Sequence, residues 1–440
     1  MQNTSRFVRD TAFAVILAAT STSVMAGHEL EPTAREFSSR AYDRRSPYIG
    51  PIKDLPTVRW VNDMKGGGQE SDKPLDPAAF PFNTPELVYG SDRGDHNHVV
   101  HAWHMNPMLG HDGQLYASSS GNGLFAFEGE TGAIRWKSLR GGVRVAPAMG
   151  PDGTIYAAEG INHSQGTKVF AIDRETGTEK WTSTVGDGVW TVPAVAPNGT
   201  VFVGSWDNTF YAFDGETGNV KWKYEVPRRS RDSFDQIISS PAVGTDGTVY
   251  FGTSLGKLYA LNGETGANKW TFTIDDPDNG IESSPALGPD GTVYFGADDG
   301  KIYAVDGMTG TSKWVSDANY AYMKSDPAIG SDGTVYMADS HGRAYALDAQ
   351  TGVRKWVFVI PEGRREIEST LTLGADNTLY FGAANGVLYA LNGKTGKRRW
   401  HLDLSEGNTR YAPIRSAPVI SADGTLYVGN LQGLLIAIHD

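Results

Sequence analysis

Four of the ten histidines fall within nine residues of the chain, at His96, His98, His101 and His104. Alternate side chains of an extended segment lie on one side, so His96 and His98 could supply two ligands to a metal ion. Asp92 or Asp95 could add a carboxylate ligand. The pattern predicts a metal or catalytic site that uses His96, His98 and His101. The alternative is a polar surface loop whose histidines hydrogen-bond locally.

A second group of candidates occupies equivalent positions in eight similar segments, three residues before a proline in most of them. Its members are His104, Arg144, Trp190, Ile238, Glu282, Lys324, Glu368 and Arg415. The residue before each is mostly Val, Ile or Met, so one register should be packed while the other approaches a central channel. Arginine and lysine could hold ligand carboxylates, glutamate could accept hydroxyl protons, and tryptophan could stack on a planar or saccharide ligand. Alternatively, the opposite charges simply neutralise one another around a solvated channel.

Three hairpin turns should lie on the same rim as this ring, at Trp206–Asp207, Asp298–Asp299 and Ser340–His341. His341 is a further ligand candidate, because it belongs to the rim opposite the first unit. Asp298 and Asp299 point to opposite sides if extended, which favours a solvated turn over a metal pair. Nothing in the chain resembles a nucleophile elbow, a phosphate loop or a zinc-protease helix.

The elements that must position these residues come from a repeat of about forty-five residues. Seven copies of Ala-x-Asp-x-x-Thr-Gly-x-x-x-Trp, three of them with Glu or Asn in place of Asp, end at Trp136, Trp181, Trp222, Trp270, Trp314, Trp356 and Trp400. Each unit reads as four short strands, with an alternating second strand and an Asp-Gly turn. A repeat of this period predicts a propeller or a solenoid.

The second strand occurs eight times, around Tyr116, Tyr156, Phe202, Tyr250, Tyr294, Tyr336, Tyr380 and Tyr427. The last unit, however, ends at Asp440 with no tryptophan strand after it. Pro56–Trp60 reads as the matching strand, so we expect the N-terminal strand to complete the last blade. The prediction is an all-β, eight-bladed propeller of four-stranded antiparallel blades, closed by that strand. The tryptophans, Trp60 included, should dock neighbouring blades rather than bind ligands.

The tryptophan motif resembles the repeat of the PQQ-like, or quinoprotein, propeller superfamily, which includes quinone-dependent alcohol dehydrogenases and BamB-type outer-membrane assembly factors. The resemblance covers residues 55 to 440 and implies the fold more than the function, since the matched residues build blades. A dehydrogenase of this kind would hold pyrroloquinoline quinone (PQQ) with calcium in the channel. The chain has no adjacent cysteines and no residue matched to the calcium ligands or the catalytic aspartate. It also lacks the lipid-modified cysteine typical of the assembly factors.

The chain divides into residues 1–26, which read as a secretory signal peptide, an N-terminal extension at 27–54, and the propeller at 55–440 with an insertion at 62–100. The apolar stretch of the signal peptide is short, and no segment outside it approaches about twenty apolar residues, so no transmembrane segment is expected. The absence of cysteine argues against disulfides, thiolate metal sites and attached haem. The formal net charge of −12 makes nucleic acid an unsuitable partner. These features predict a secreted or periplasmic protein.

Three functions fit these observations. The first is a binding or scaffold protein for a protein, peptide or glycan partner in the cell envelope. The second is a PQQ-dependent dehydrogenase, in which the cations of the ring meet the quinone carboxylates. The third is a polysaccharide lyase or other metal-assisted enzyme that uses the His96–His104 segment. The sequence leaves open whether the chain is an enzyme, and it does not identify a ligand, a metal or an oligomeric state.

Overall fold

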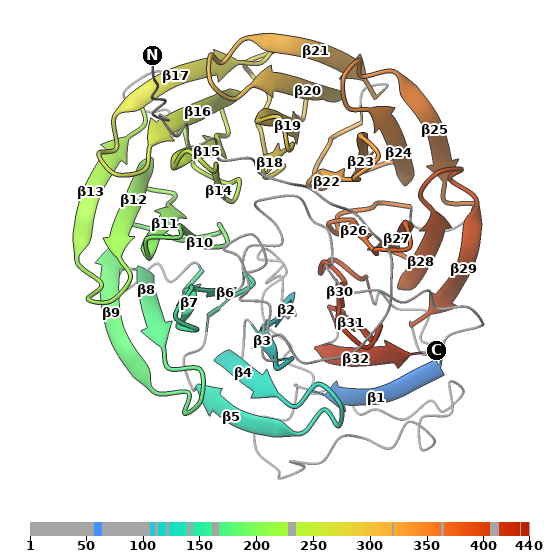
Figure 1. Ribbon diagram of the computed structural model, residues 1–440, viewed down its shortest axis with the longest axis horizontal. Helices are drawn as coiled ribbons and strands as arrows, with labels where there is room; N and C mark the ends of the chain where they lie inside the picture. The colour runs from blue at the N-terminus through green and yellow to red at the C-terminus, as the bar shows by residue number, and fades with distance from the viewer. Residues whose placement is uncertain are drawn as a thin grey trace, which may run out of the picture. The chain divides into compact units, whose positions relative to one another are not determined.

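The computed structural model describes residues 57–63, 106–110, 113–119, 123–138, 142–143, 145–160, 167–227, 235–318, 321–361, 365–404, 413–431 and 433–439. Within these ranges the chain forms eight four-stranded antiparallel sheets and no helix (Figure 1). The prediction of an eight-bladed β-propeller with four-stranded antiparallel blades is therefore confirmed. The described residues include no helix long and apolar enough to cross a membrane.

Each blade holds four consecutive strands, except the last, which takes its outermost strand from the N-terminal part of the propeller. Blade 1 contains β2 (Asn106–Leu109), β3 (Leu115–Ser119), β4 (Gly123–Phe127) and β5 (Ile134–Ser138); blade 2 contains β6 (Ala148–Met149), β7 (Ile155–Ala158), β8 (Thr167–Ile172) and β9 (Glu179–Val185); blade 3 contains β10 (Ala194–Val195), β11 (Thr200–Gly204), β12 (Thr209–Asp214) and β13 (Val220–Glu225); blade 4 contains β14 (Ala242–Val243), β15 (Thr248–Gly252), β16 (Lys257–Asn262) and β17 (Asn268–Thr273). Blade 5 contains β18 (Ala286–Leu287), β19 (Thr292–Gly296), β20 (Lys301–Asp306) and β21 (Ser312–Asp317); blade 6 contains β22 (Ala328–Ile329), β23 (Thr334–Ala338), β24 (Arg343–Asp348) and β25 (Arg354–Val359); blade 7 contains β26 (Thr372–Leu373), β27 (Thr378–Gly382), β28 (Val387–Asn392) and β29 (Arg398–Asp403); blade 8 contains β30 (Val419–Ile420), β31 (Leu426–Gly429), β32 (Leu434–His439) and β1 (Thr57–Asp63).

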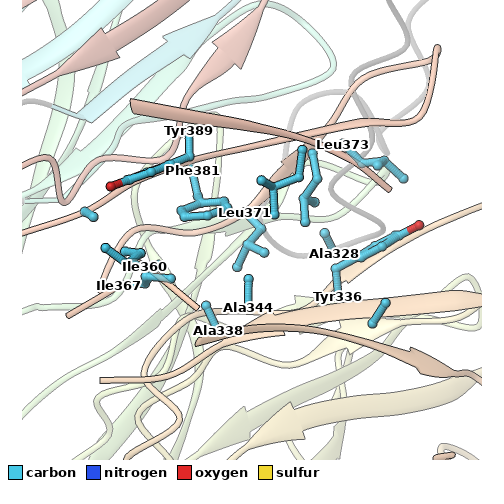
Figure 2. Packing of buried hydrophobic residues seen from close by; sticks show 14 of the residues in the cluster. Ala328, Tyr336, Ala338, Ala344, Ile360, Ile367, Leu371, Leu373, Phe381 and Tyr389 are labelled. Carbon is cyan, nitrogen blue, oxygen red and sulfur yellow. The ribbon is translucent and has the colours of Figure 1, made fainter. Parts of the chain in front are cut away.

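The hydrophobic core lies between adjacent blades. The second and third strands of each blade are buried on both faces, whereas the fourth strand alternates between exposed and covered residues, as in β25. Figure 2 shows one inter-blade layer, in which Tyr336 and Ala328 of blade 6 face Leu371 and Phe381 of blade 7. Because each layer needs side chains from two blades, one blade alone could not bury its apolar faces.

The repeated tryptophan of one blade lies against the Thr-Gly turn of the next. Trp270 of blade 4 donates its indole N–H to the carbonyl of Gly307 in blade 5, at 3.0 Å. A Cβ built on Gly310 would lie 2.7 Å from Cδ2 of the same indole, so only glycine fits there. Equivalent indole hydrogen bonds start from Trp136, Trp181, Trp222, Trp314 and Trp356. The glycine of Thr-Gly thus admits the ring, in addition to adopting a positive φ.

Blade 8 joins the two ends of the propeller. Strand β1 pairs antiparallel with β32, with Thr57 opposite His439. Arg59 of β1 contacts Asp423 through an ion pair of 3.0 Å. Tyr427 of β31 donates its hydroxyl to the carbonyl of Gly129 in blade 1, at 2.9 Å. The side chain of Trp60, predicted to dock like the other tryptophans, lies outside the described residues.

Candidate functional site

The channel ring predicted from sequence lies where each between-blade connection enters a first strand. Here buried and half-buried residues alternate: Ile281 is fully buried and the next residue, Glu282, is half-buried. The same contrast holds for the pairs at 189–190, 237–238, 323–324, 367–368 and 414–415. The residue that follows is a buried serine or threonine that holds the backbone of the second strand. Ser369, for example, accepts from Gly382 N at 3.0 Å and donates to Gly382 O at 2.9 Å.

A belt of hydrogen bonds connects blades 3 to 7 just below this register. Val192 N donates to Ser240 Oγ at 3.0 Å, and Ser240 N donates to Ser284 Oγ at 3.1 Å. Ser284 N donates to Asp326 Oδ1 at 2.6 Å, and Thr370 Oγ1 donates to Asp326 Oδ2 at 2.8 Å. These residues are almost fully buried. The ring side chains of blades 3 to 7 therefore extend from a backbone that hydrogen bonds connect to the neighbouring blades.

The four charged members of the ring that the structure describes form two neighbouring ion pairs. Lys324 Nζ lies 3.0 Å from Glu282 Oε2, with both side chains a little over a third exposed. Arg415 and Glu368 form the second ion pair. A ligand carboxylate would therefore compete with a glutamate of this protein at each of these two cations. The arrangement presents a half-exposed, polar and largely neutral surface.

Asp298 joins this group from the hairpin between β19 and β20. Its burial, followed by the nearby charge of Glu282, raises the pKa of Asp298 to about 7, although the positive charge of Lys324 opposes the rise. Asp299 is turned to other partners, since it accepts from the Tyr303 hydroxyl at 2.5 Å and from Lys301 N at 3.1 Å. The sequence interpretation of a merely solvated turn missed Asp298. Lys324, whose charge acts on Asp298, comes from the connection into the neighbouring blade, so the sequence around Asp298 gave no sign of it.

An aromatic pair lies on another part of the ring, in blade 3. The rings of Trp190 and Trp206 stack with centroids 4.7 Å apart and an interplanar angle of 27°. Trp206 N also donates to Gly188 O at 3.0 Å, which attaches the hairpin to the connection. Asp207 beside it accepts from the Tyr211 hydroxyl at 2.6 Å and is therefore used in holding the turn.

The remaining predicted candidates are His341 and five residues that the structure does not describe. His341 is exposed, and its backbone N–H donates to Asp339 Oδ1 at 2.9 Å. His104 and Arg144 of the ring lie outside the described residues, as do His96, His98 and His101. Among the residues that the structure describes, no group of three histidine, aspartate or glutamate side chains could hold a metal ion. The metal site on the histidine segment stays a prediction.

Comparison with known proteins supports the same architecture. The sequence matches the family described as outer membrane protein assembly factor BamB over residues 126–285 and 275–440, well over half of the chain. The crystal structure of BamB from Moraxella catarrhalis superposes with a TM-score of 0.60 at 17% identity, over 77% of this chain and 96% of that one. A europium-containing methanol dehydrogenase superposes with a TM-score of 0.65 at 15% identity, over 91% of each chain. At such identities the likeness is one of fold.

A relative of another kind shares one segment. The serine/threonine-protein kinase AfsK of Streptomyces griseus is 30% identical over 131 residues, which are 27% of this chain and 15% of the kinase. The match spans only a small part of the kinase's own length. It indicates shared sequence over that segment and carries no kinase activity to this chain.

Proposed function

This chain belongs to the BamB family of PQQ-like β-propellers, and we propose that it is a binding scaffold that holds a partner protein of the cell envelope at its channel mouth. The channel mouth is defined here by Trp190, Glu282, Lys324, Glu368 and Arg415. The family description, which names an outer-membrane assembly factor, supports an envelope location and a protein partner. A secreted or periplasmic location belongs to this proposal.

The paired charges of the mouth are the main support. Glu282–Lys324 and Glu368–Arg415 compensate each other, so the mouth has little net charge while offering donors and acceptors that are still partly exposed. Such a surface suits the polar backbone and side chains of another protein, since interface charges contribute mainly to orientation and specificity. The hydrogen-bond belt beneath it keeps the mouth preorganised, which lowers the entropy lost on binding.

The alternative of a PQQ-dependent dehydrogenase has less support among the described residues. Two of the three cations expected to hold the quinone carboxylates, Lys324 and Arg415, are already paired with glutamates. The third, Arg144, lies outside the described residues. No group of three histidine, aspartate or glutamate side chains among the described residues is placed to bind a metal ion. Titration with PQQ and calcium tests this point, and tight binding that is lost in a Lys324→Ala, Arg415→Ala variant would favour the dehydrogenase.

Photo-crosslinking tests the scaffold proposal. Tyr322 is about half exposed on the connection that leads to Lys324, whose Nζ lies 5.7 Å from the tyrosine ring centroid. Met308 is 86% exposed on the β20–β21 turn, at the opposite end of the same blade. With p-benzoylphenylalanine at each site in turn, a defined envelope protein should be captured from position 322 and not from position 308.

Charge reversal links that capture to the ion pair. Glu282→Lys and Lys324→Glu should each weaken binding of the captured partner, once purified, and the double exchange should restore part of the affinity because it restores the pair. Equal capture at 322 and 308, or affinity unchanged by both single reversals, would contradict a partner site at the channel mouth.

A further inference from the structure

The turn between the third and fourth strands of blade 7 carries more positive charge than the equivalent turns. Lys394, Lys397, Arg398 and Arg399 lie within six residues, and all four side chains are exposed. From the residue that opens the turn to the tryptophan, blades 1 to 5 carry a net charge of zero or below. Since the whole chain has a formal net charge of −12, the cations of blade 7 are a local exception.

One of these cations has a structural role that other blades share. Arg399 Nη1 lies 2.8 Å from Asp376 Oδ2, and the lysine at this position forms the same ion pair in blades 2, 4 and 5. Lys394, Lys397 and Arg398 form no ion pair with any residue that the structure describes. Neighbouring like charges repel one another, so these three side chains do not stabilise the blade through their charge.

The backbone of the turn does not require a cation at these three positions. In blade 7, Gly396 N donates to Asn392 O at 2.8 Å, and Thr395 N donates to Asn392 Oδ1 at 3.1 Å. In blade 4, Gly266 N donates to Asn262 O at the same distance. Blade 4 makes this turn with Glu, Ala and Asn at the corresponding positions. The same conformation therefore forms without the three cations.

The third residue of each turn divides this rim of the propeller into two halves. It is glutamate in blades 1 to 4, at Glu130, Glu175, Glu216 and Glu264. In blades 5, 6 and 7 it is Met308, Gln350 and Lys394. All seven side chains are exposed. Because the tryptophan of each blade lies against the turn of the next, the turns follow one another around the rim in blade order. One half is acidic, and the other lacks these acids and ends in the cations of blade 7.

Two exposed apolar side chains belong to the half without glutamates. Met308 in blade 5 is 86% exposed, and Val353 in blade 6 is 64% exposed, which makes them the most exposed large apolar residues in the described chain. Cations beside exposed apolar side chains suit an anionic bilayer, where phosphates meet the cations and the interface accepts apolar groups. An acidic protein would match the cations but not Met308.

We propose that the third-to-fourth turns of blades 5 to 7 dock the protein on an anionic phospholipid bilayer. Lys394, Lys397 and Arg398 contact the headgroup phosphates, and the two apolar side chains enter the interface. The glutamates of blades 1 to 4 are repelled by the same surface, so the rim approaches it with blades 5 to 7 foremost. The net negative charge of the chain permits this contact, because salt screens exposed charges beyond about 8 Å. The rim lies at the opposite end of the blades from the channel mouth, which stays open to a partner.

Vesicle co-sedimentation tests the proposal. The purified protein should bind vesicles of phosphatidylcholine mixed with phosphatidylglycerol, bind them less at high salt, and not bind pure phosphatidylcholine. The triple variant Lys394→Glu, Lys397→Ala, Arg398→Asn gives blade 7 the turn residues of blade 4, and an unchanged Tm shows that the fold is kept. Its affinity for the mixed vesicles should fall about a hundredfold, since each cation near an anionic surface contributes about fivefold.

Two further variants separate local contact from net charge. The double variant Lys137→Glu, Lys223→Glu changes the net charge by the same amount as the triple variant, but on exposed positions of the fourth strands of blades 1 and 3. It should leave vesicle affinity nearly unchanged. Met308→Ser keeps every charge and should lower the affinity about fivefold, because it removes apolar area from the interface.

Several results would overturn the proposal. No binding to the mixed vesicles, or equal binding to pure phosphatidylcholine, would exclude an anionic bilayer. Affinity unchanged in the triple variant, or lowered equally in the Lys137→Glu, Lys223→Glu variant, would show that this rim is not the contact. Affinity unchanged in Met308→Ser would leave the cations alone. Binding of poly-glutamate, but not of vesicles, that is lost in the triple variant would assign the rim to an acidic protein instead.

Discussion

The contact between a Thr-Gly turn and the tryptophan of the preceding blade can be tested quantitatively in blade 5. Gly310 and Gly291 have nearly the same backbone conformation, with φ of 74° and 78°. Their surroundings differ: a Cβ on Gly310 would lie 2.7 to 2.9 Å from three atoms of the Trp270 ring, whereas nothing lies within 4 Å of a Cβ on Gly291. Alanine substitution at the two sites therefore separates backbone strain from blade docking.

The expected magnitudes follow from these two terms. Alanine at positive φ costs about 1–2 kcal/mol at either site, offset by about 0.4–1 kcal/mol because alanine restricts the unfolded chain. Gly291→Ala should therefore lower the free energy of unfolding by only about 1 kcal/mol. Gly310→Ala adds the displacement of the indole, which as overpacking costs a further ~1–3 kcal/mol. The total for Gly310→Ala is then about 2–4 kcal/mol.

Urea unfolding followed by far-ultraviolet circular dichroism measures both variants on one scale, provided that the m-value is unchanged. In a Trp270→Phe background the excess cost of Gly310→Ala should shrink, because the smaller ring leaves space for the methyl group. Equal destabilisation by the two alanine substitutions, or an excess that persists with phenylalanine at 270, would refute the docking argument.

Three further outcomes are expected. Trp314→Phe removes a hydrogen bond of 2.9 Å from the indole N–H to Ala349 O. It should destabilise the protein by about 1 kcal/mol more than Trp400→Phe, because Nε1 of Trp400 has no acceptor in the described chain. The difference between the urea midpoints of the two variants measures this effect. Asp326→Ala leaves the buried N–H of Ser284 without its acceptor and should lower the free energy of unfolding by about 1–3 kcal/mol. Asp326→Asn keeps an acceptor oxygen and should lower it less. Thermal unfolding of both variants checks this order. The pKa of Asp298, about 7 in the folded protein, lies above its unfolded value near 4, so the unfolding free energy should fall as pH rises from about 4 to about 7 and then level off. Asp298→Asn should reduce that fall, and urea midpoints at pH 5 and pH 8 that shift equally in both proteins would contradict the assignment.

Much of the fold can be predicted from the sequence because each blade repeats the same local signals. The Thr-Gly and Asp-Gly turns, the alternating second strand and the tryptophan recur at a fixed period, and the structure places them at the same points of every complete blade. The alternation that separates Ile281 from Glu282 could likewise be read in advance, since it depends only on the side-chain period of an extended segment.

The candidate sites were less accessible to sequence reasoning. Glu282 and Lys324 could be assigned to one ring, but not to one another, because their pairing depends on the spacing and orientation of two blades. Asp298 looked like a solvated turn residue, and its half-buried place beside Glu282 has no local signature.

The sequence by itself determined the strands, the turns and the number of blades, because these depend on backbone conformation and side-chain period within about forty residues. Only the tertiary structure decided which charges neutralise each other, which carboxyl group holds a proton near neutral pH, and which polar atoms are buried without a partner. Those properties depend on desolvation and on distances between neighbouring blades, and both arise only when the blades pack against one another.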